Sequence, residues 1–154
     1  MTMPEVLITI AVGMIIMSIA APSLGKARDR YAVQTARREI AATVEAARGA
    51  SVQRGHPAHF YVRGNAVVAI ADTAAPGQAV TGTLVVLAPR RFDAAYGVTL
   101  SLANSADTAI AFDARGFANP RIGHVARIAV VGRSTRDSVC ISSFGQVLPK
   151  DCLQ

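Results

Sequence analysis

The sequence predicts an α+β fold in which a long N-terminal helix packs on an antiparallel β-sheet. Two observations carry this prediction. The first 25 residues are almost entirely apolar and run directly into residues 26–54, whose apolar side chains repeat with helical spacing. After residue 57 the pattern changes to short runs of β-branched and apolar residues separated by turn signals, and one helix followed by many strands is typical of the α+β class.

Residues 1–25 form the first predicted part of the chain, a helix apolar enough to span a membrane or to form a filament core. No formal charge occurs from Val6 to Ala21, and Glu5 is the only ionisable side chain before Lys26. At about 1.5 Å of rise per residue, a helix of this length matches the roughly 30 Å hydrocarbon core of a bilayer. A carboxylate in such a helix normally has a partner, so we expect Glu5 to have a specific role.

A secretory signal peptide and a plain membrane anchor are the alternatives for this segment. A signal peptide has basic residues before its apolar region, whereas here an acid precedes it and the cations Lys26, Arg28 and Arg30 follow it. Positive charges after an apolar run favour a cytoplasmic location for the part that follows. That preference conflicts with an extracytoplasmic destination unless a basic leader has been removed before Met1.

The second predicted part, residues 26–154, is a globular domain that begins with an amphipathic helix over residues 26–54. Gly49 and then Gly55-His56-Pro57 weaken and end this helix. Small side chains on its apolar stripe allow a sheet to approach closely. The stripe consists of Val33, Ala36, Ile40, Val44, Ala47 and Ser51.

Residues 57–154 are predicted to form the β-sheet. The clearest signal is Gly64-Asn65, a pair typical of a tight hairpin turn, between strands at 58–63 and 66–71. Loops are expected at 72–78, 89–97 and 132–137, and a turn at 113–116. Further strands are expected at residues 80–87, 98–102, 108–112, 126–131 and 138–142, with a short edge at 146–148.

Several residues of the apolar segment occur at the spacing of a known superfamily. Glu5, the apolar run behind it, Gly13 and Pro22 resemble the mature N-terminus of type IV pilins and type II secretion pseudopilins. In that superfamily a prepilin peptidase removes a short basic leader and the new first residue is N-methylated, which implies that Met1 is that residue. Met1 and Pro4 depart from the commonest pattern, which has Phe first and Leu or Ile fourth.

The second half of the chain extends the resemblance. Residues 47–54, which read Ala-Arg-Gly-Ala-Ser-Val-Gln-Arg, are similar to the AR-x-x-A-x-x-R helix end of the GspH/FimT-like branch, with the second alanine shifted by one place. The segment from Phe112 to Gly116 resembles the F-x-x-x-G turn of that branch, and residues 138–141 and 145–147 resemble its closing strands. The branch includes minor pseudopilins near filament tips and minor pilins linked to DNA uptake.

This resemblance gives Glu5 a function in assembly. In a bundle of identical helices, the N-terminal ammonium of a neighbouring subunit can pair with the carboxylate. Such a pair adds little net stability but fixes register, because a misaligned subunit leaves both charges unpaired. A neutral, protonated Glu5 near the lipid headgroups is the alternative. Gly13 and Pro22 are candidate weak points of the helix, since Pro22 cannot donate a hydrogen bond to residue 18.

The two cysteines, Cys140 and Cys152, lie close to the C-terminus. Outside the cytoplasm they would most simply form a disulfide, which closes a loop of about 13 residues and contributes around 3 kcal/mol in the chain-entropy treatment. Their spacing fits neither a CxxC redox motif nor a zinc site. Two free buried thiols are the alternative.

The charge balance leaves one functional question open. The net charge is +6, and all the basic residues follow the apolar segment. Arg133 and Arg136 are expected in a hairpin loop and Lys150 lies near the C-terminus, so these three are candidate contacts for DNA or another anion. The resemblance to FimT-like pilins favours DNA, whereas the alternatives are a solvated basic surface or one that pairs with acids on neighbouring subunits.

Catalysis is not indicated. The sequence has no GxSxG, HExxH or Walker A motif, and no GxGxxG between a strand and a helix. His56 and His59 are three positions apart but lack a third metal ligand nearby. We expect no catalytic residue, no cofactor and no metal.

The sequence therefore predicts a structural subunit of a type IV pilus-like filament. Its partners are identical or related pilin subunits, the inner membrane before assembly, and the machinery of pilus assembly or secretion, with an extracellular or periplasmic filament as the final location. The alternatives are a low-copy minor pilin or pseudopilin at the filament tip, serving DNA uptake or type II secretion, and an anchored binding module that never polymerises.

Overall fold

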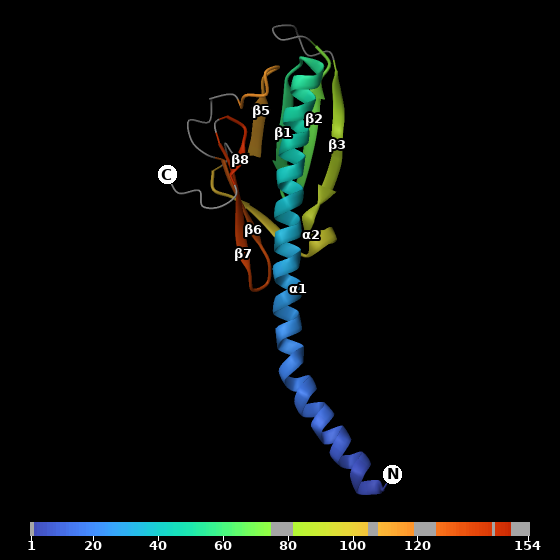
Figure 1. Ribbon diagram of the computed structural model, residues 1–154. Helices are drawn as coiled ribbons and strands as arrows, with labels where there is room; N and C mark the ends of the chain where they lie inside the picture. Colours follow the sequence, from blue (N-terminus) through green and yellow to red (C-terminus); the bar gives the residue numbers. More distant parts are fainter. Residues whose placement is uncertain (1, 75–81, 105–107, 119–125, 143, 149–154) are drawn as a thin grey trace.

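A computed structural model of the chain describes residues 2–74, 82–104, 108–118, 126–142 and 144–148 (Figure 1). The strands pack on the C-terminal half of one long helix, and the N-terminal half of this helix projects away from the domain. The elements are α1 (Met3–Arg54), β1 (Ala58–Arg63), β2 (Ala66–Asp72), β3 (Thr83–Arg91), α2 (Phe92–Tyr96), β4 (Thr99–Leu102), β5 (Ala109–Phe112), β6 (Ala126–Val131), β7 (Arg136–Ile141) and β8 (Val147–Leu148).

Helix α1 ends where the sequence predicts. Its last residue is Arg54, and Gly55 follows in the left-handed conformation with φ 65°, which a glycine adopts without steric cost. The predicted apolar stripe is confirmed, because all six of its side chains are buried against the sheets. They are Val33, Ala36, Ile40, Val44, Ala47 and Ser51.

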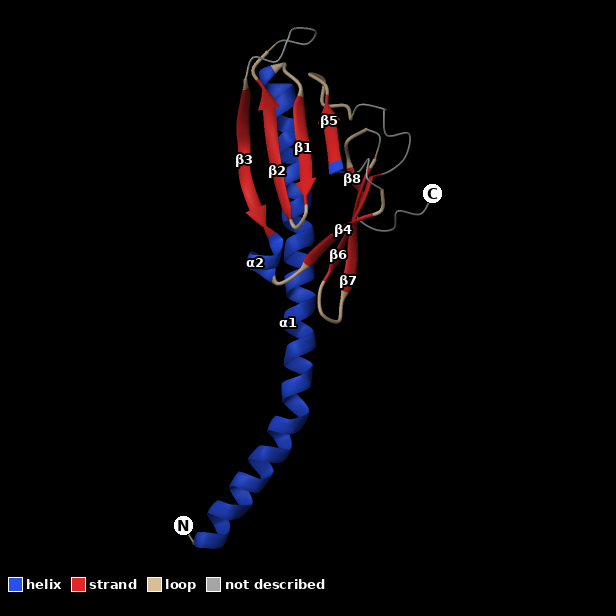
Figure 2. Ribbon diagram, turned by 180° about the vertical axis from the view of Figure 1, so that it is seen from behind, coloured by secondary structure: helices blue, strands red, loops and turns tan. Residues whose placement is uncertain are grey.

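The predicted antiparallel arrangement is confirmed, but the strands form two four-stranded sheets rather than a single one (Figure 2). The first sheet has the order β3-β2-β1-β5 and the second has the order β4-β6-β7-β8. Both sheets contribute to one core over α1, in which Phe60 and Phe112 of the first sheet join Ile128 and Val139 of the second. Alternation of apolar residues identifies each strand but not its neighbour, so the division into two sheets cannot be read from it.

The hairpin at Gly64-Asn65 is confirmed. Arg63 is the last residue of β1 and pairs with Ala66, the first residue of β2. Gly64 has φ 57°, the backbone conformation that favours glycine at this position of a two-residue turn.

The boundaries predicted for the third strand were wrong. The strand runs from Thr83 to Arg91, so it continues through Pro89 into the region predicted as a loop. Proline is tolerated because β3 is at the edge of its sheet, where one side needs no hydrogen-bonding partner. The register against β2 shifts near this point, from Val67 opposite Arg90 to Ala69 opposite Leu87, which leaves one extra residue on β3.

The rest of the predicted 89–97 loop is the short helix α2. Phe92 is fully buried and its backbone N–H donates to the carbonyl oxygen of Asn65 at 2.8 Å. Tyr96 donates a hydrogen bond from its hydroxyl to Glu39 of α1, which raises the pKa of Tyr96. Arg90 pairs with the same carboxylate at 2.7 Å and lies over the Tyr96 ring. Helix α2 is therefore held in place by the buried Phe92 ring and by the bond from Tyr96 to Glu39 on α1.

Candidate functional site

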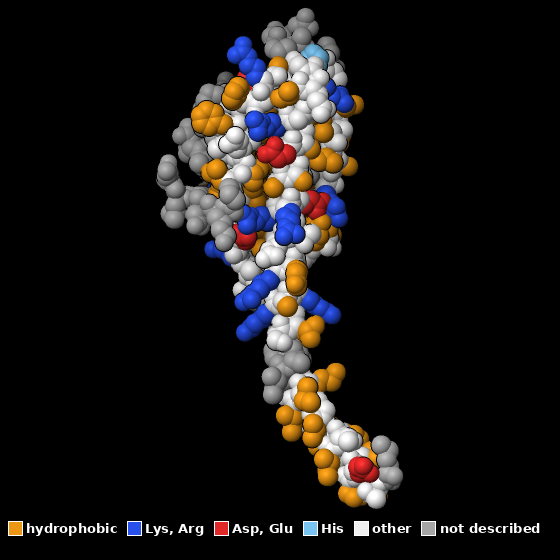
Figure 3. Space-filling view, viewed as in Figure 1, with side chains coloured by type: hydrophobic (Ala, Val, Ile, Leu, Met, Phe, Trp, Pro, Cys, Tyr) orange, Lys and Arg blue, Asp and Glu red, His pale blue; other side chains and the backbone are white. Residues whose placement is uncertain are grey.

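The N-terminal half of α1 projects beyond the domain as an apolar rod (Figure 3). By length and composition this helix can cross a membrane, and no part of its apolar window is buried within the described chain. A helix that is hydrophobic all round requires lipid or other protein around it. The exposed side chains include Met3, Val6, Leu7, Ile8, Ile10, Val12, Met14, Ile15, Ile16 and Met17.

Glu5 caps the start of this helix. Its Oε2 atom accepts a hydrogen bond from the backbone N–H of Thr2 at 3.2 Å. A threonine followed three positions later by glutamate is the sequence signature of a capping box, in which the acid satisfies a backbone donor at the helix start. This role of Glu5 was not predicted, although Thr2-Met3-Pro4-Glu5 carries the signal. The pairing with a neighbouring subunit stays a prediction.

Both candidate weak points lie inside α1. Among the described residues, no side chain and no backbone beyond the adjacent helical turns lies within 4 Å of a Cβ placed on Gly13, and the helix continues past Pro22 to Arg54. The projecting half of the helix is bent in both ribbon views (Figures 1 and 2). Ser18 donates from its hydroxyl to the carbonyl oxygen of Ile15 at 2.8 Å, within the same helix. Unwinding at Gly13 or Pro22 stays a prediction.

Asp29 holds the turn between β6 and β7 against α1. Its carboxylate accepts backbone N–H bonds from Arg133 at 2.9 Å and Ser134 at 2.7 Å, and a third bond from the Ser134 hydroxyl at 2.8 Å. The bonds from Ser134 are the main reason that the pKa of Asp29 falls from its usual 3.8 to about 2. Gly132 permits this approach, since a Cβ there would collide with the Asp29 carboxylate and the Val33 side chain.

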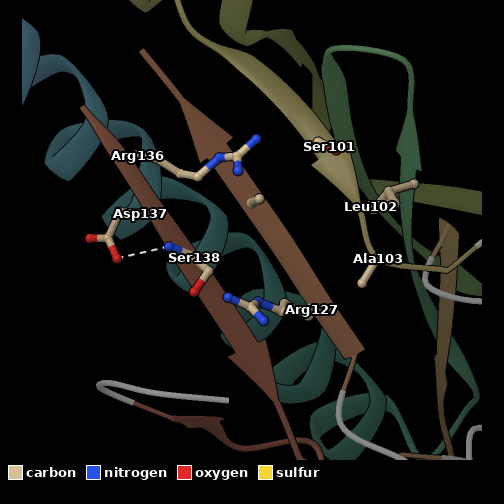
Figure 4. A pocket seen from close by; sticks show the side chains of 8 residues that line it. Ser101, Leu102, Ala103, Arg127, Arg136, Asp137 and Ser138 are labelled. Atoms are coloured by element: carbon tan, nitrogen blue, oxygen red, sulfur yellow. Dashed lines mark hydrogen bonds between the residues drawn. The ribbon is translucent and has the colours of Figure 1, made fainter. Parts of the chain in front are cut away.

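The structure places Arg133 and Arg136 at different sites. Arg133 is exposed in the turn beside α1, whereas Arg136 is the first residue of β7, so its predicted loop position was wrong. Pairing of Arg136 with Val131 extends the β6–β7 ladder into the predicted loop and shortens the turn. Arg136 lines a cavity of about 520 Å³ on the second sheet together with Arg127 of β6 (Figure 4).

Three sequence-predicted residues lie outside the described part of the chain: Met1, Lys150 and Cys152. Cys140 is buried in β7, and its pairing with Cys152 stays a prediction. The two described candidates for anion binding, Arg133 and Arg136, line separate hollows, so they do not form one groove.

The two histidines His56 and His59 follow the end of α1, and His59 lies in β1. His59 contacts Asp72 through its Nε2 atom at 3.1 Å and stacks on Tyr61. Within the described ranges, no three His, Cys, Asp or Glu side chains are close enough to hold a metal ion.

A long helix that buries one half against antiparallel sheets and exposes an apolar other half defines a pilin-like α+β fold. The structure is similar to the type IV minor pilin FimU of Pseudomonas aeruginosa in two crystal forms. In one form the TM-score is 0.58 at 17% sequence identity, over 80% of this chain and 91% of that chain. In the other it is 0.54 at 16% identity, over 77% and 93%.

These similarities confirm, at the level of the fold, the resemblance to type IV pilins. No protein-family model and no curated protein sequence matches the chain. The assignment to the GspH/FimT-like branch stays a prediction.

Proposed function

We propose that this chain is a subunit of a type IV pilus-like filament, which polymerises through the apolar half of α1. One observation carries the proposal: this half of the helix is exposed all round in the described structure, although its composition requires an apolar environment. A membrane supplies that environment before assembly and the neighbouring helices of a filament supply it afterwards. In this proposal Met1 is the processed, N-methylated first residue, and the filament is extracellular or periplasmic.

Glu5 supplies the register of the filament in this proposal, through the N-terminal amine of a neighbouring subunit. The capping bond uses one oxygen of its carboxylate, and a carboxylate can accept several hydrogen bonds. The same residue can therefore start the helix and pair with a neighbour. The two roles differ in what they require: capping needs a hydrogen-bond acceptor, whereas pairing needs a negative charge.

Two substitutions separate these roles. Glu5→Gln keeps an acceptor suited to a capping box but removes the charge, while Glu5→Ala removes both. We expect both variants to lose filament yield in a pull-down of sheared filaments, while the domain keeps the thermal unfolding midpoint of the wild type. Normal yield from Glu5→Gln would show that the charge is dispensable and would refute the pairing. Normal yield from both variants would show that assembly does not need Glu5, whereas absence of the wild-type chain from the sheared filaments would favour an anchored module that does not polymerise.

A low-copy minor subunit is the second candidate, and the similarity to a protein described as a minor pilin favours it. Mass spectrometry of purified filaments separates the two: a chain that dominates the fibre is the main subunit, whereas a rare chain beside another dominant pilin primes, caps or serves the filament. Service in DNA uptake or type II secretion would belong to this second case.

A further inference from the structure

Four cations surround α1 where it leaves the domain. Lys26, Arg28 and Arg30 lie on the helix itself, and Arg133 is brought beside them because Asp29 holds the β6–β7 turn. We call these four residues the basic collar. All four are exposed, and none of them forms an ion pair with a described carboxylate. Figure 3 shows Lys and Arg side chains gathered at this level, between the domain and the apolar rod.

A hollow of about 320 Å³ opens beside the collar. Arg28 and Arg133 line it, and the other lining residues besides Asp29 are uncharged: Gly25, Ala32, Tyr96 and Gly97. Two guanidinium groups around an open space suit the bidentate recognition of phosphate.

Asp29 also lines the hollow, but both of its oxygen atoms are occupied by donors from the turn. Four positive side chains against this one carboxylate leave a net charge of +3 at the collar.

The collar lies at the level of lipid headgroups when the apolar rod spans a bilayer. From Glu5 to Lys26 a helix rises about 32 Å, which matches the roughly 30 Å hydrocarbon core. The headgroup layer adds about 5–7 Å on each side, enough to contain the helix from Lys26 to Arg30. Tyr31 follows directly and is 71% exposed, and exposed tyrosines are enriched at membrane–water interfaces.

We propose that the basic collar binds anionic phospholipid headgroups, with the phosphate in the hollow between Arg28 and Arg133, and so holds the domain on the membrane surface before assembly. This inference rests on the proposed membrane anchor. Lipid is favoured over nucleic acid as the occupant because the collar continues directly from the apolar rod and lies one hydrocarbon thickness from Glu5.

The absence of tryptophan from the sequence provides a reporter. Full-length Tyr31→Trp protein is reconstituted in vesicles of phosphatidylcholine, alone or mixed with phosphatidylglycerol, that contain a lipid with a dansyl headgroup. We expect stronger energy transfer from the tryptophan in the phosphatidylglycerol vesicles, with the difference lost at high salt.

In this background, Arg28→Gln with Arg133→Gln removes the two guanidinium groups, and we expect the population docked on the headgroups to fall about fivefold for each cation removed. Arg54→Gln is the matched control, because Arg54 is an exposed arginine at the far end of the same helix. Its energy transfer should equal that of the parent protein.

The outcomes separate this inference from the proposed function. Protein that floats with both kinds of vesicle but shows equal transfer in each overturns the inference and leaves the membrane anchor intact. Protein that floats with neither overturns the anchor and the inference together. A collar variant that loses binding to duplex DNA but keeps the transfer of its parent would identify a nucleic-acid surface and would overturn the lipid assignment.

Discussion

The Nε atom of Arg48 donates a hydrogen bond to the carbonyl oxygen of Gly116 at 3.1 Å, joining α1 to the turn after β5. These residues belong to two separate segments that resemble the GspH/FimT-like branch, and the fold brings the segments into contact. Gly116 has φ 80°, and a Cβ at this position would lie 2.8 Å from the Val52 side chain. The contact therefore depends on a glycine in the turn as well as on the arginine.

Gly116→Ala should lower the free energy of unfolding by about 1–3 kcal/mol, because the left-handed backbone strains an alanine and its methyl group collides with Val52. Urea unfolding of the full-length protein in detergent checks this. Gly49→Ala is the matched control: Gly49 lies within α1, and no described residue beyond the adjacent helix backbone comes within 4 Å of its Cβ position, so alanine there should be neutral or stabilise by up to about 1 kcal/mol. Equal losses from both variants would contradict the prediction.

The contact between Asp29 and the β6–β7 turn should depend on pH. Folding favours the ionised carboxylate, because the pKa of Asp29 is about 2 in the folded protein and usually 3.8. The stabilisation is therefore complete above pH 3.8 and is lost as the pH falls through about 2. Hydrogen exchange of the Arg133 and Ser134 amides measures the stability of this contact.

In the wild type the protection of these two amides should fall over that range, whereas in Asp29→Ala it should be low at every pH. Protection in Asp29→Ala equal to that of the wild type at neutral pH would show that the carboxylate does not hold the turn.

Tyr96→Phe should destabilise the attachment of α2 to α1. The substitution removes the hydroxyl that donates to Glu39 and leaves the ring and its contact with Phe92 in place. We expect a loss of about 1 kcal/mol in the free energy of unfolding. Tyr31→Phe is the control, since Tyr31 is exposed and its hydroxyl has no partner among the described residues. A Tyr96→Phe variant as stable as Tyr31→Phe would refute the assigned role.

The proposed Cys140–Cys152 disulfide should contribute around 3 kcal/mol to stability. Cys152→Ser tests this without placing a polar group in the interior at Cys140, which is buried. Alkylation of the denatured, unreduced wild type, read by mass spectrometry, should label neither cysteine. Labelling of both would establish the alternative of two free thiols.

The parts of the fold that were predicted correctly depend on residues close together in the sequence. The stripe from Val33 to Ser51 follows from helical spacing, and Gly64-Asn65 follows from the conformational freedom of glycine in a tight turn. The end of the third strand was predicted wrongly at Pro89. Whether a proline can lie in a strand depends on the position of that strand in its sheet, which the sequence does not give.

The candidate site was predicted less completely than the fold. The apolar rod is evident from composition alone, but the bond between Asp29 and Ser134 joins residues 105 positions apart, and no local pattern pairs them. The capping role of Glu5 was within reach of the sequence. Threonine at position 2 and glutamate at position 5 have the spacing of a capping box, which is a local pattern.

The apolar rod and the part of α1 that supports the domain are one continuous helix, so a bend in the rod would be amplified along α1. From Pro22 to Arg54 the helix is about 48 Å long, so a change of about 20° in helix direction near Pro22 moves the far end of the domain by roughly 17 Å. A small bend near Pro22 would thus produce a large displacement of the domain near Arg54. The projecting half of α1 is already curved in the structure (Figure 1).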